Sequence, residues 1–121
     1  MEPKHILLVE DDSAVMRTLV NALSEYRLTI ACDGVEALSL LAGDETVDLI
    51  ITDYLMPSMT GDELIGRARA KRPDLKVLMI SGHYEILSRA NLTWWTTERH
   101  LAKPFHIEEL TSAVTQLLGA A

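Results

Sequence analysis

The sequence predicts an α/β domain in which a parallel β-sheet is covered by helices on both faces. Short apolar segments rich in β-branched residues alternate along the chain with segments whose apolar residues recur at helical spacing. This alternation is typical of a parallel sheet, because each helix that connects two strands packs against one face of the sheet. The chain has 121 residues, of which 48% are hydrophobic and 24% charged, a balance typical of a folded globular domain. We therefore expect one domain over residues 1–121.

Two strands and two helices are expected in the first third of the chain. Residues 5–9 (HILLV) form a short apolar run typical of a buried strand. A helix that Asp12 or Ser13 can cap follows, because apolar residues then recur at spacings of three and four. These apolar residues are Val15, Met16, Leu19, Val20, Leu23 and Tyr26. Residues 28–32 (LTIAC) are typical of a second strand, and residues 35–41 have room for a short helix.

The middle of the chain predicts two more strands, separated by a loop and a helix. Residues 49–52 (LIIT) form the third apolar run. A loop is expected over residues 57–61 and a helix over residues 61–71, where the dipeptide Arg72-Pro73 ends it because a residue before proline disfavours the helical conformation. Residues 76–81 (KVLMIS) are then typical of a fourth strand.

A fifth strand and a last helix complete the predicted fold. Residues 100–103 (HLAK) are typical of the strand. Apolar residues at helical spacing mark the helix, namely Ile107, Leu110, Val114 and Leu117. Before this strand, a helix is expected over about the first half of residues 84–99, and no structure is assigned to the second half. That second half contains Trp94-Trp95, of which at least one is expected at the surface, because adjacent residues rarely both point inward.

The composition excludes several classes of protein. The formal net charge of −7 disfavours binding to nucleic acid, which needs basic residues to replace the counterions of the phosphates, and it also disfavours an anionic membrane surface. The longest apolar runs are shorter than the ~18–20 residues that span a bilayer, and the start MEPKHILLVEDD reaches charged residues too early for a signal peptide. Cys32 is the only cysteine, so no internal disulfide can form, and we expect an inert core thiol. These features favour a cytoplasmic protein that binds neither nucleic acid nor membrane.

Acidic and polar residues follow four of the predicted strands at the points where those strands end. Ligands of open parallel sheets bind beyond the carboxyl ends of the strands, so these side chains are expected to lie close together. They are Glu10, Asp11 and Asp12 after the first strand, Asp53 after the third, Ser81 and Gly82 at the fourth, and Lys103 at the fifth. Crowded carboxylates repel one another, and a bound divalent cation removes that cost. Oxygen ligands with open positions for water and phosphate suit Mg²⁺.

The same residues predict phosphoryl chemistry at Asp53. A carboxylate can attack phosphorus and become an aspartyl phosphate. Mg²⁺ would neutralise the phosphoryl oxygens, Lys103 would supply a second positive charge, and Ser81 could donate a hydrogen bond to a phosphoryl oxygen. Asp12 is expected to cap the first helix, either with or without an additional role in binding the metal.

Four motifs resemble the receiver domain of bacterial two-component response regulators. They are ILLVEDD (6–12), ITDYLMPSMTGDEL (51–64), VLMISG (77–82) and LAKPF (101–105). Each motif is weak alone, but their order and separations make the set highly specific, and the resemblance runs from about residue 4 to residue 118. It implies a flavodoxin-like, doubly wound fold with a five-stranded parallel sheet of order 2-1-3-4-5 and about five helices.

The resemblance also implies the roles of the matching residues. Asp53 would be the phosphoacceptor, and Lys103 would pair with the phosphoryl group. Mg²⁺ would be bound by Asp11 and Asp53, by Glu10 directly or through water, and by the main-chain carbonyl of Leu55. In this family, a histidine kinase or a histidine phosphotransfer protein donates the phosphoryl group. The receiver is a signalling domain that catalyses only its own phosphorylation and dephosphorylation.

Two further residues would take part in the conformational switch of this family. Ser81 stands where the family has Thr or Ser, and His100 stands where many members have an aromatic switch residue. His100 is therefore either this switch residue or an ordinary, partly buried histidine. Phosphorylation would shift the conformation of the fourth helix, the fifth strand and the fifth helix, the face expected to bind a downstream protein partner. The peptide bond between Lys103 and Pro104 is expected to be cis.

Other functions fit these residues less well. A degenerate receiver that binds proteins without phosphate is the main alternative, but such domains usually lose some of the acids, the hydroxyl or the lysine. An Asp-nucleophile hydrolase would need a second acid shortly after the nucleophile, where Tyr54 and Leu55 stand. An FMN carrier would need a phosphate-binding loop after the first strand, where Glu10 and Asp11 would repel phosphate. The parent protein is expected to be either a free-standing regulator or a longer protein such as a hybrid histidine kinase.

Overall fold

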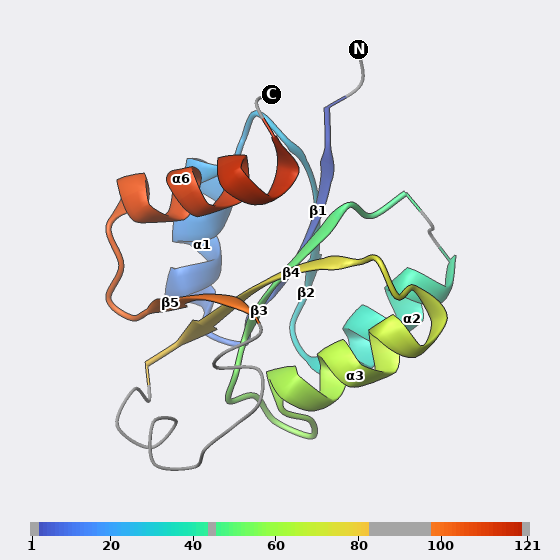
Figure 1. The fold of residues 1–121 in the computed structure, drawn as a ribbon. Coiled ribbons are helices and arrows are strands. Elements are labelled where there is room, and N and C mark those ends of the chain that lie inside the picture. Colours follow the sequence, from blue (N-terminus) through green and yellow to red (C-terminus); the bar gives the residue numbers. More distant parts are fainter. Residues whose placement is uncertain (1–2, 44–45, 83–97, 120–121) are drawn as a thin grey trace.

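A computed structural model describes residues 3–43, 46–82 and 98–119 of the chain. Five parallel strands form one sheet in the order β2-β1-β3-β4-β5, and helices cover both faces of this sheet (Figure 1). The predicted α/β fold class and strand order are therefore confirmed. The strands are β1 (His5–Val9), β2 (Arg27–Ala31), β3 (Leu49–Asp53), β4 (Lys76–Ser81) and β5 (Arg99–Ala102). The helices within the described residues are α1 (Ser13–Ala22), α2 (Gly34–Gly43), α3 (Gly61–Lys71) and α6 (Ile107–Leu118).

Apolar side chains alternate between the two faces of the sheet and build a separate core on each face. In β1, Ile6 and Leu8 join the core beneath α1 and α6, whereas Leu7 and Val9 join the core beneath α2 and α3. Figure 1 shows the two helix pairs on opposite sides of the sheet. All residues of the central strand β3 are buried, as expected for a strand that is covered on both faces. The end of β3 is thus held firmly from both sides.

The strand order reverses at β1, and this reversal determines where a ligand site can form. The chain leaves β1 toward β2 and then crosses back past β1 to reach β3. The connecting helices α1 and α2 accordingly pack on opposite faces of the sheet. Ligand sites of open α/β sheets lie at such a reversal, beyond the carboxyl ends of the strands. The residues that follow β1 and end β3 occupy this position.

Some predicted boundaries are wrong by one or two residues. The strands β2 and β5 each begin and end one residue earlier than predicted, and β3 includes Asp53. The amide of Arg27 donates to the Lys4 carbonyl at 3.0 Å, so pairing with the edge of β1 begins before the apolar run does. The helix α2 extends beyond the predicted residues 35–41 at both ends. Backbone pairing, which the apolar pattern does not report, decides these end residues.

Two expectations about single residues, Tyr26 and Cys32, are also wrong. Tyr26 was expected on the first helix, but α1 ends at Ala22, and Tyr26 lies in the turn before β2 with only 8% of its surface exposed. Its amide donates to the carbonyl of Leu23, three residues earlier, rather than continuing the helix. Cys32 is exposed and not in the core, because it follows the last residue of the edge strand β2. For Tyr26, the error arose because helical spacing of apolar residues continues beyond Ala22, where α1 ends.

The remaining expectations concern residues outside the described parts of the chain or the membrane. The helix predicted in the first half of residues 84–99 lies outside the described residues, as do Trp94 and Trp95. Among the residues that are described, every helix is too short or too polar to cross a bilayer.

Candidate functional site

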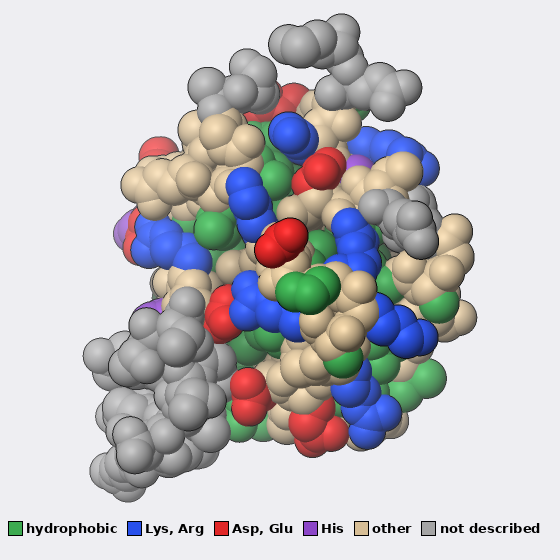
Figure 2. All heavy atoms as spheres, turned by 45° about the vertical axis from the view of Figure 1, so that its right-hand side comes forward, with side chains coloured by type: hydrophobic (Ala, Val, Ile, Leu, Met, Phe, Trp, Pro, Cys, Tyr) green, Lys and Arg blue, Asp and Glu red, His purple; other side chains and the backbone are tan. Residues whose placement is uncertain are grey.

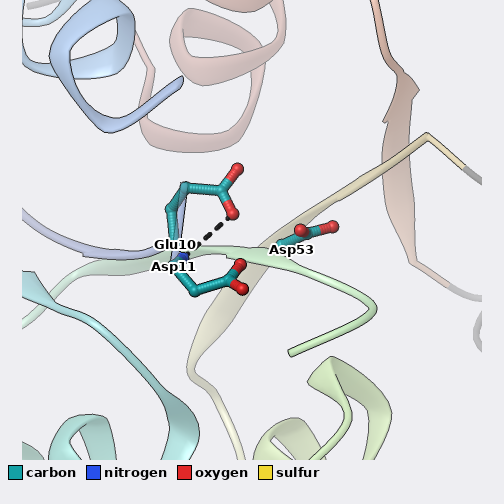
Figure 3. Close-up of side chains that lie close together, drawn as sticks. All are labelled: Glu10, Asp11 and Asp53. Atoms are coloured by element: carbon teal, nitrogen blue, oxygen red, sulfur yellow. Dashed lines mark hydrogen bonds between the residues drawn. The ribbon is translucent and has the colours of Figure 1, made fainter. Parts of the chain in front are cut away.

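Three carboxylate side chains come together beyond the carboxyl ends of β1 and β3. Glu10 and Asp11 follow β1, and Asp53 is the last residue of β3. One carboxylate oxygen from each residue lies within 4.8 Å of those of the other two, and Figure 3 shows the three side chains gathered at this edge of the sheet. Glu10 is 3% exposed and Asp53 8% exposed, whereas Asp11 is open to solvent. Three of the four acids that were predicted to lie close together therefore do so, and Asp12 is the exception.

The alternation of side chains along the strands explains why Glu10, Asp53 and Lys103 face one another. Each follows a strand residue of the α1–α6 core at an interval of two, so each points to the same face of the sheet. For Lys103 that preceding residue is Leu101. At the carboxyl edge the core ends, and this same row of positions carries charged groups instead of apolar ones.

Lys103 joins the acids on β1 and β3 to the end of β5. Its Nζ atom donates to Glu10 Oε1 at 2.6 Å and to Asp53 Oδ2 at 3.1 Å. The main chain positions it, because the Lys103 amide donates to the Ser81 carbonyl at 2.8 Å and continues the pairing of β4 with β5. The peptide bond between Lys103 and Pro104 is cis, as predicted. The lysine is thus presented to two acids by a backbone that is itself anchored.

The electrostatics of this cluster are dominated by Glu10. Burial raises the pKa of the Glu10 carboxyl from 4.5 to about 7, the hydrogen bond from Lys103 opposes this rise, and the nearby Asp53 adds to it. Burial acts to lower the pKa of Lys103, but its hydrogen bond to Glu10 and the charge of Asp53 outweigh burial, so the pKa is raised. Among the described residues, Lys103 is paired with two of the three carboxyl groups and supplies one positive charge. When all three groups are ionised, the cluster therefore has a net negative charge.

The backbone that follows Asp53 is held in place by a close approach of α3. The amide of Tyr54 donates to the Ile80 carbonyl at 3.0 Å, and the Gly61 amide donates to the Tyr54 carbonyl at 2.7 Å. A Cβ atom at Gly61 would lie 2.5 Å from the main-chain oxygen of Asp53 and 3.2 Å from Cα of Tyr54. Only glycine permits this contact, so the first residue of α3 locks the backbone at Asp53.

The other predicted site residues lie around this cluster. Ser81 is buried at the end of β4, one residue beyond Ile80, which pairs with Asp53 across the sheet. His100 is half-buried on β5, pairs with Met79, and has its Nδ1 atom 3.1 Å from the Glu98 carbonyl. Their roles as phosphate ligand and switch residue stay predictions, as does the role of the main-chain carbonyl of Leu55.

Asp12 lies next to the cluster but serves the helix. Its Oδ1 atom accepts from the amides of Ala14 at 2.8 Å and Val15 at 3.3 Å, which caps the first turn of α1. Among the described residues, the group of acids close enough to share a metal ion consists of Glu10, Asp11 and Asp53 and does not include Asp12.

Comparison with known protein families identifies the family of this chain. The family model of the response regulator receiver domain matches residues 6–115. This chain belongs to the response regulator receiver domain family. It is therefore a signalling module of two-component systems rather than an enzyme in its own right, and a receiver domain implies a histidine kinase as partner.

Several relatives of this receiver domain resemble it over nearly its whole length. It is 37% identical over 120 residues to the response regulator receiver protein CpdR of Brucella abortus, covering 98% of this chain and 99% of that protein. It is also 37% identical to the sensor kinase CckA of the same organism, where the match covers 93% of this chain and 12% of the kinase. Among solved structures, the response regulator TrrA of Thermotoga maritima in complex with Mg²⁺–BeF has a TM-score of 0.82 at 32% identity, with 95% of this chain and 99% of that chain covered.

The donor set of this receiver domain fits Mg²⁺. Three carboxylates within 4.8 Å of one another supply hard oxygen ligands, and Asp11 leaves the group open to solvent on one side. Among the described residues, Lys103 supplies one positive charge against these three carboxylates, so the cluster has a deficit of positive charge when all three are ionised. A divalent cation would correct that deficit, and a solved relative binds Mg²⁺ together with BeF.

Two features of the site were not predicted from the sequence. The first is the direct ion pair between Lys103 and Glu10, residues that were assigned to different partners. The second is the role of Gly61, which was read only as the boundary between a loop and a helix. Gly61 directly follows the N-cap Thr60, and a glycine inside a helix, where it is unfavourable, could have signalled a close backbone approach.

Proposed function

We propose that this receiver domain accepts a phosphoryl group on Asp53 from a phosphohistidine of a histidine kinase or a histidine phosphotransfer protein. The observation that carries the proposal is the setting of Asp53. It is a nearly buried carboxylate at the strand-order reversal, with Lys103 Nζ at 3.1 Å and two further acids within 4.8 Å. A carboxylate held in this way can act as a nucleophile, because the neighbouring cation stabilises charge that develops on phosphoryl oxygens.

The transfer forms one bond and breaks one bond. A carboxylate oxygen of Asp53 attacks phosphorus, and the bond between phosphorus and the donor's imidazole nitrogen breaks, with its electron pair kept by the imidazole. Lys103 moves from its contact with Asp53 to a phosphoryl oxygen, and the Ser81 hydroxyl donates to another. Water later attacks the same phosphorus atom, which releases phosphate and restores the carboxylate of Asp53.

Mg²⁺ would be held by this chain's own oxygen atoms. The ligands would be the carboxylates of Asp11 and Asp53, Glu10 directly or through water, and the main-chain carbonyl of Leu55. When bound, Mg²⁺ supplies charge neutralisation for the phosphoryl oxygens. Glu10 and Asp53 must be ionised to bind it, and Lys103 would keep the ion pair with whichever acid the metal leaves free.

The consequence of phosphorylation would be a change of conformation that a partner reads. Ser81 and His100 would be the switch residues, since one ends β4 and the other lies on β5. The surface formed by the fourth helix, β5 and α6 would bind a downstream protein partner in the cytoplasm, with residues 1–121 acting as a single domain. We expect no direct binding to nucleic acid or to membranes.

The test is intact mass after incubation with Mg²⁺ and acetyl phosphate, a small phosphoryl donor. We expect the mass of one added phosphoryl group, which is absent in Asp53→Asn and after chelation with EDTA. Asp74→Asn is the matched control, because Asp74 is an exposed acid before β4, at the opposite edge of the sheet. Labelling that persists in Asp53→Asn would move the site elsewhere. Absence of labelling in the wild type would favour a phosphate-independent binding module.

A further inference from the structure

A groove lies between the C-terminal halves of α2 and α3, and no residue of the acidic site lines it. Its volume is about 330 Å³. We call the four apolar side chains that line it, Leu38, Leu41, Ala42 and Ala68, its floor, and the three basic ones, Arg67, Lys71 and Arg72, its rim. We call this feature the α2–α3 groove. Its size is at the lower end of ligand pockets and suits a few side chains rather than a whole cofactor.

The stability of α3 explains only part of the charge at the rim, because Lys71 lies in the last turn, where a positive charge is favourable, but Arg67 lies earlier in the helix. Arg67 and Lys71 are four residues apart on α3, so two like charges lie on one face of the helix, which destabilises it slightly. Among the described residues, neither side chain forms an ion pair or a hydrogen bond. Arg72 is held in position, because its Nη2 atom donates to the Val47 carbonyl at 2.6 Å. This concentration of positive charge occurs in a chain with a net charge of −7.

The groove lies toward the amino ends of the strands, whereas the acidic site lies beyond their carboxyl ends. The helices α2 and α3 both begin near the carboxyl ends of strands and run back toward the amino ends, so their C-terminal halves lie away from Asp53. Figure 2 brings the side of α2 and α3 forward and shows Lys and Arg side chains around hydrophobic ones, with Asp and Glu side chains on the same face. A molecule bound here would leave the acidic site, β5 and α6 uncovered.

We infer that the α2–α3 groove binds a peptide segment of a partner protein that carries both acidic and large apolar side chains. The apolar floor would take the apolar side chains, and the rim would pair with Asp or Glu of the segment. Charge complementarity selects this occupant, because the groove is lined by apolar side chains and by three cations, of which Arg67 and Lys71 form no ion pair with a described residue. Since the groove lies away from Asp53, the binding would be independent of phosphorylation and would act as a constant tether.

The test selects peptides that bind the whole chain and then localises them. A phage-displayed library of random peptides is panned on the immobilised protein, and enriched peptides are synthesised and titrated by fluorescence anisotropy. We expect enriched peptides to combine acidic with large apolar residues. Their affinity should fall about tenfold or more in Arg67→Glu/Lys71→Glu, and should fall with added salt. Arg67→Gln/Lys71→Gln, which removes charge without reversing it, should show a smaller loss.

The matched control is Lys4→Glu/Arg17→Glu, which makes the same charge change at two exposed residues outside the groove. It should leave peptide affinity almost unchanged, and acetyl phosphate should still label all variants, which shows that they are folded. Affinity should also be the same with EDTA and with Mg²⁺ plus acetyl phosphate. The inference would be overturned by failure to enrich acidic and apolar peptides, by equal losses of affinity in Arg67→Glu/Lys71→Glu and Lys4→Glu/Arg17→Glu, or by dependence on phosphorylation. So would concentration-dependent dimerisation that Arg67→Glu/Lys71→Glu abolishes, since a second copy would then occupy the groove.

Discussion

The ionisation of Glu10 depends on folding, because in the folded protein the residue is 3% exposed and the pKa of its carboxyl is raised to about 7. In the unfolded chain the carboxyl loses its proton near its ordinary pKa of 4.5, whereas the folded protein keeps the proton until about pH 7. Proton binding by the folded state therefore stabilises it fully below the unfolded pKa, and this contribution is lost as the pH rises through the folded pKa. The contribution of Glu10 to the free energy of unfolding therefore decreases as the pH is raised from 4.5 to about 7.

We predict that the free energy of unfolding of the metal-free protein decreases as the pH is raised from about 5 to about 7, relative to Glu10→Gln. The substitution removes the titrating group but keeps a side chain that can bond to Lys103. Urea unfolding in EDTA at several pH values measures the difference between the two proteins. An identical pH dependence in the two proteins would show that Glu10 does not have the raised pKa described above.

Gly61 is a second residue whose identity follows from a single contact. We predict that Gly61→Ala lowers the free energy of unfolding by about 1–3 kcal/mol, because a Cβ atom would lie 2.5 Å from the main-chain oxygen of Asp53. The displaced backbone should also weaken Mg²⁺ binding. Urea unfolding and titration with Mg²⁺ measure the two effects.

Gly66→Ala is the control for this change, because Gly66 lies in the same helix and a Cβ atom there would contact nothing within 4 Å. Alanine is a better helix former than glycine, so Gly66→Ala should raise stability by up to about 1 kcal/mol. Two Gly→Ala changes five residues apart are therefore expected to have opposite signs. Equal effects would contradict the close approach at Gly61.

At the scale of the element, α1 depends on a cap that lies beside the acidic site. We predict that Asp12→Ala lowers the free energy of unfolding by about 0.5–2 kcal/mol, because two amides of the first turn lose their acceptor. Mg²⁺ affinity should change little, since Asp12 is not among the three clustered acids. Urea unfolding and Mg²⁺ titration report on the two properties separately.

Asp11→Ala, one residue earlier, is the reciprocal control. It should remove most of the Mg²⁺ affinity with little change in the stability of the metal-free protein, because Asp11 is exposed and belongs to the cluster. Adjacent aspartates are thus expected to separate helix capping from metal binding. A large loss of Mg²⁺ affinity in Asp12→Ala would give Asp12 the second role that the sequence left open.

At the scale of the whole molecule, Lys103 ties the last strand to the two strands that carry the acids. We predict that Lys103→Ala lowers the stability of the metal-free protein by about 1–3 kcal/mol at pH 8, because buried carboxylates lose their cation. The loss should be smaller at pH 5, where Glu10 is protonated. Mg²⁺ affinity should rise, because a competing positive charge has been removed.

Lys4→Ala is the control, since Lys4 is an exposed lysine before β1 whose side chain has no ion pair among the described residues. It should change neither stability nor Mg²⁺ affinity appreciably. Thermal unfolding at both pH values, with and without Mg²⁺, completes the comparison. If Lys103→Ala bound Mg²⁺ more weakly than the wild type, the lysine would have to assist the metal rather than compete with it.

The sequence alone determined the α/β class, the five strands and the identity of the acids that meet. Alternation of strands with helices has few compact solutions, and parallel strands place their carboxyl ends at one edge. The proximity of Asp53 and Glu10 could therefore be predicted, although the two residues lie far apart in the chain. Local patterns were sufficient for this, because the periodicity of apolar residues in strands and helices is a property of the local sequence.

The tertiary structure alone decided which charged groups touch and how closely the backbones approach. Lys103 bonds to Glu10 as well as Asp53, Gly61 lies against the backbone of Asp53, and Cys32 lies outside the core. Each depends on a distance of a few ångströms between segments that are separate in the sequence, or on which strand lies at the edge of the sheet. Packing sets those distances, and a one-dimensional pattern of residue types does not contain them.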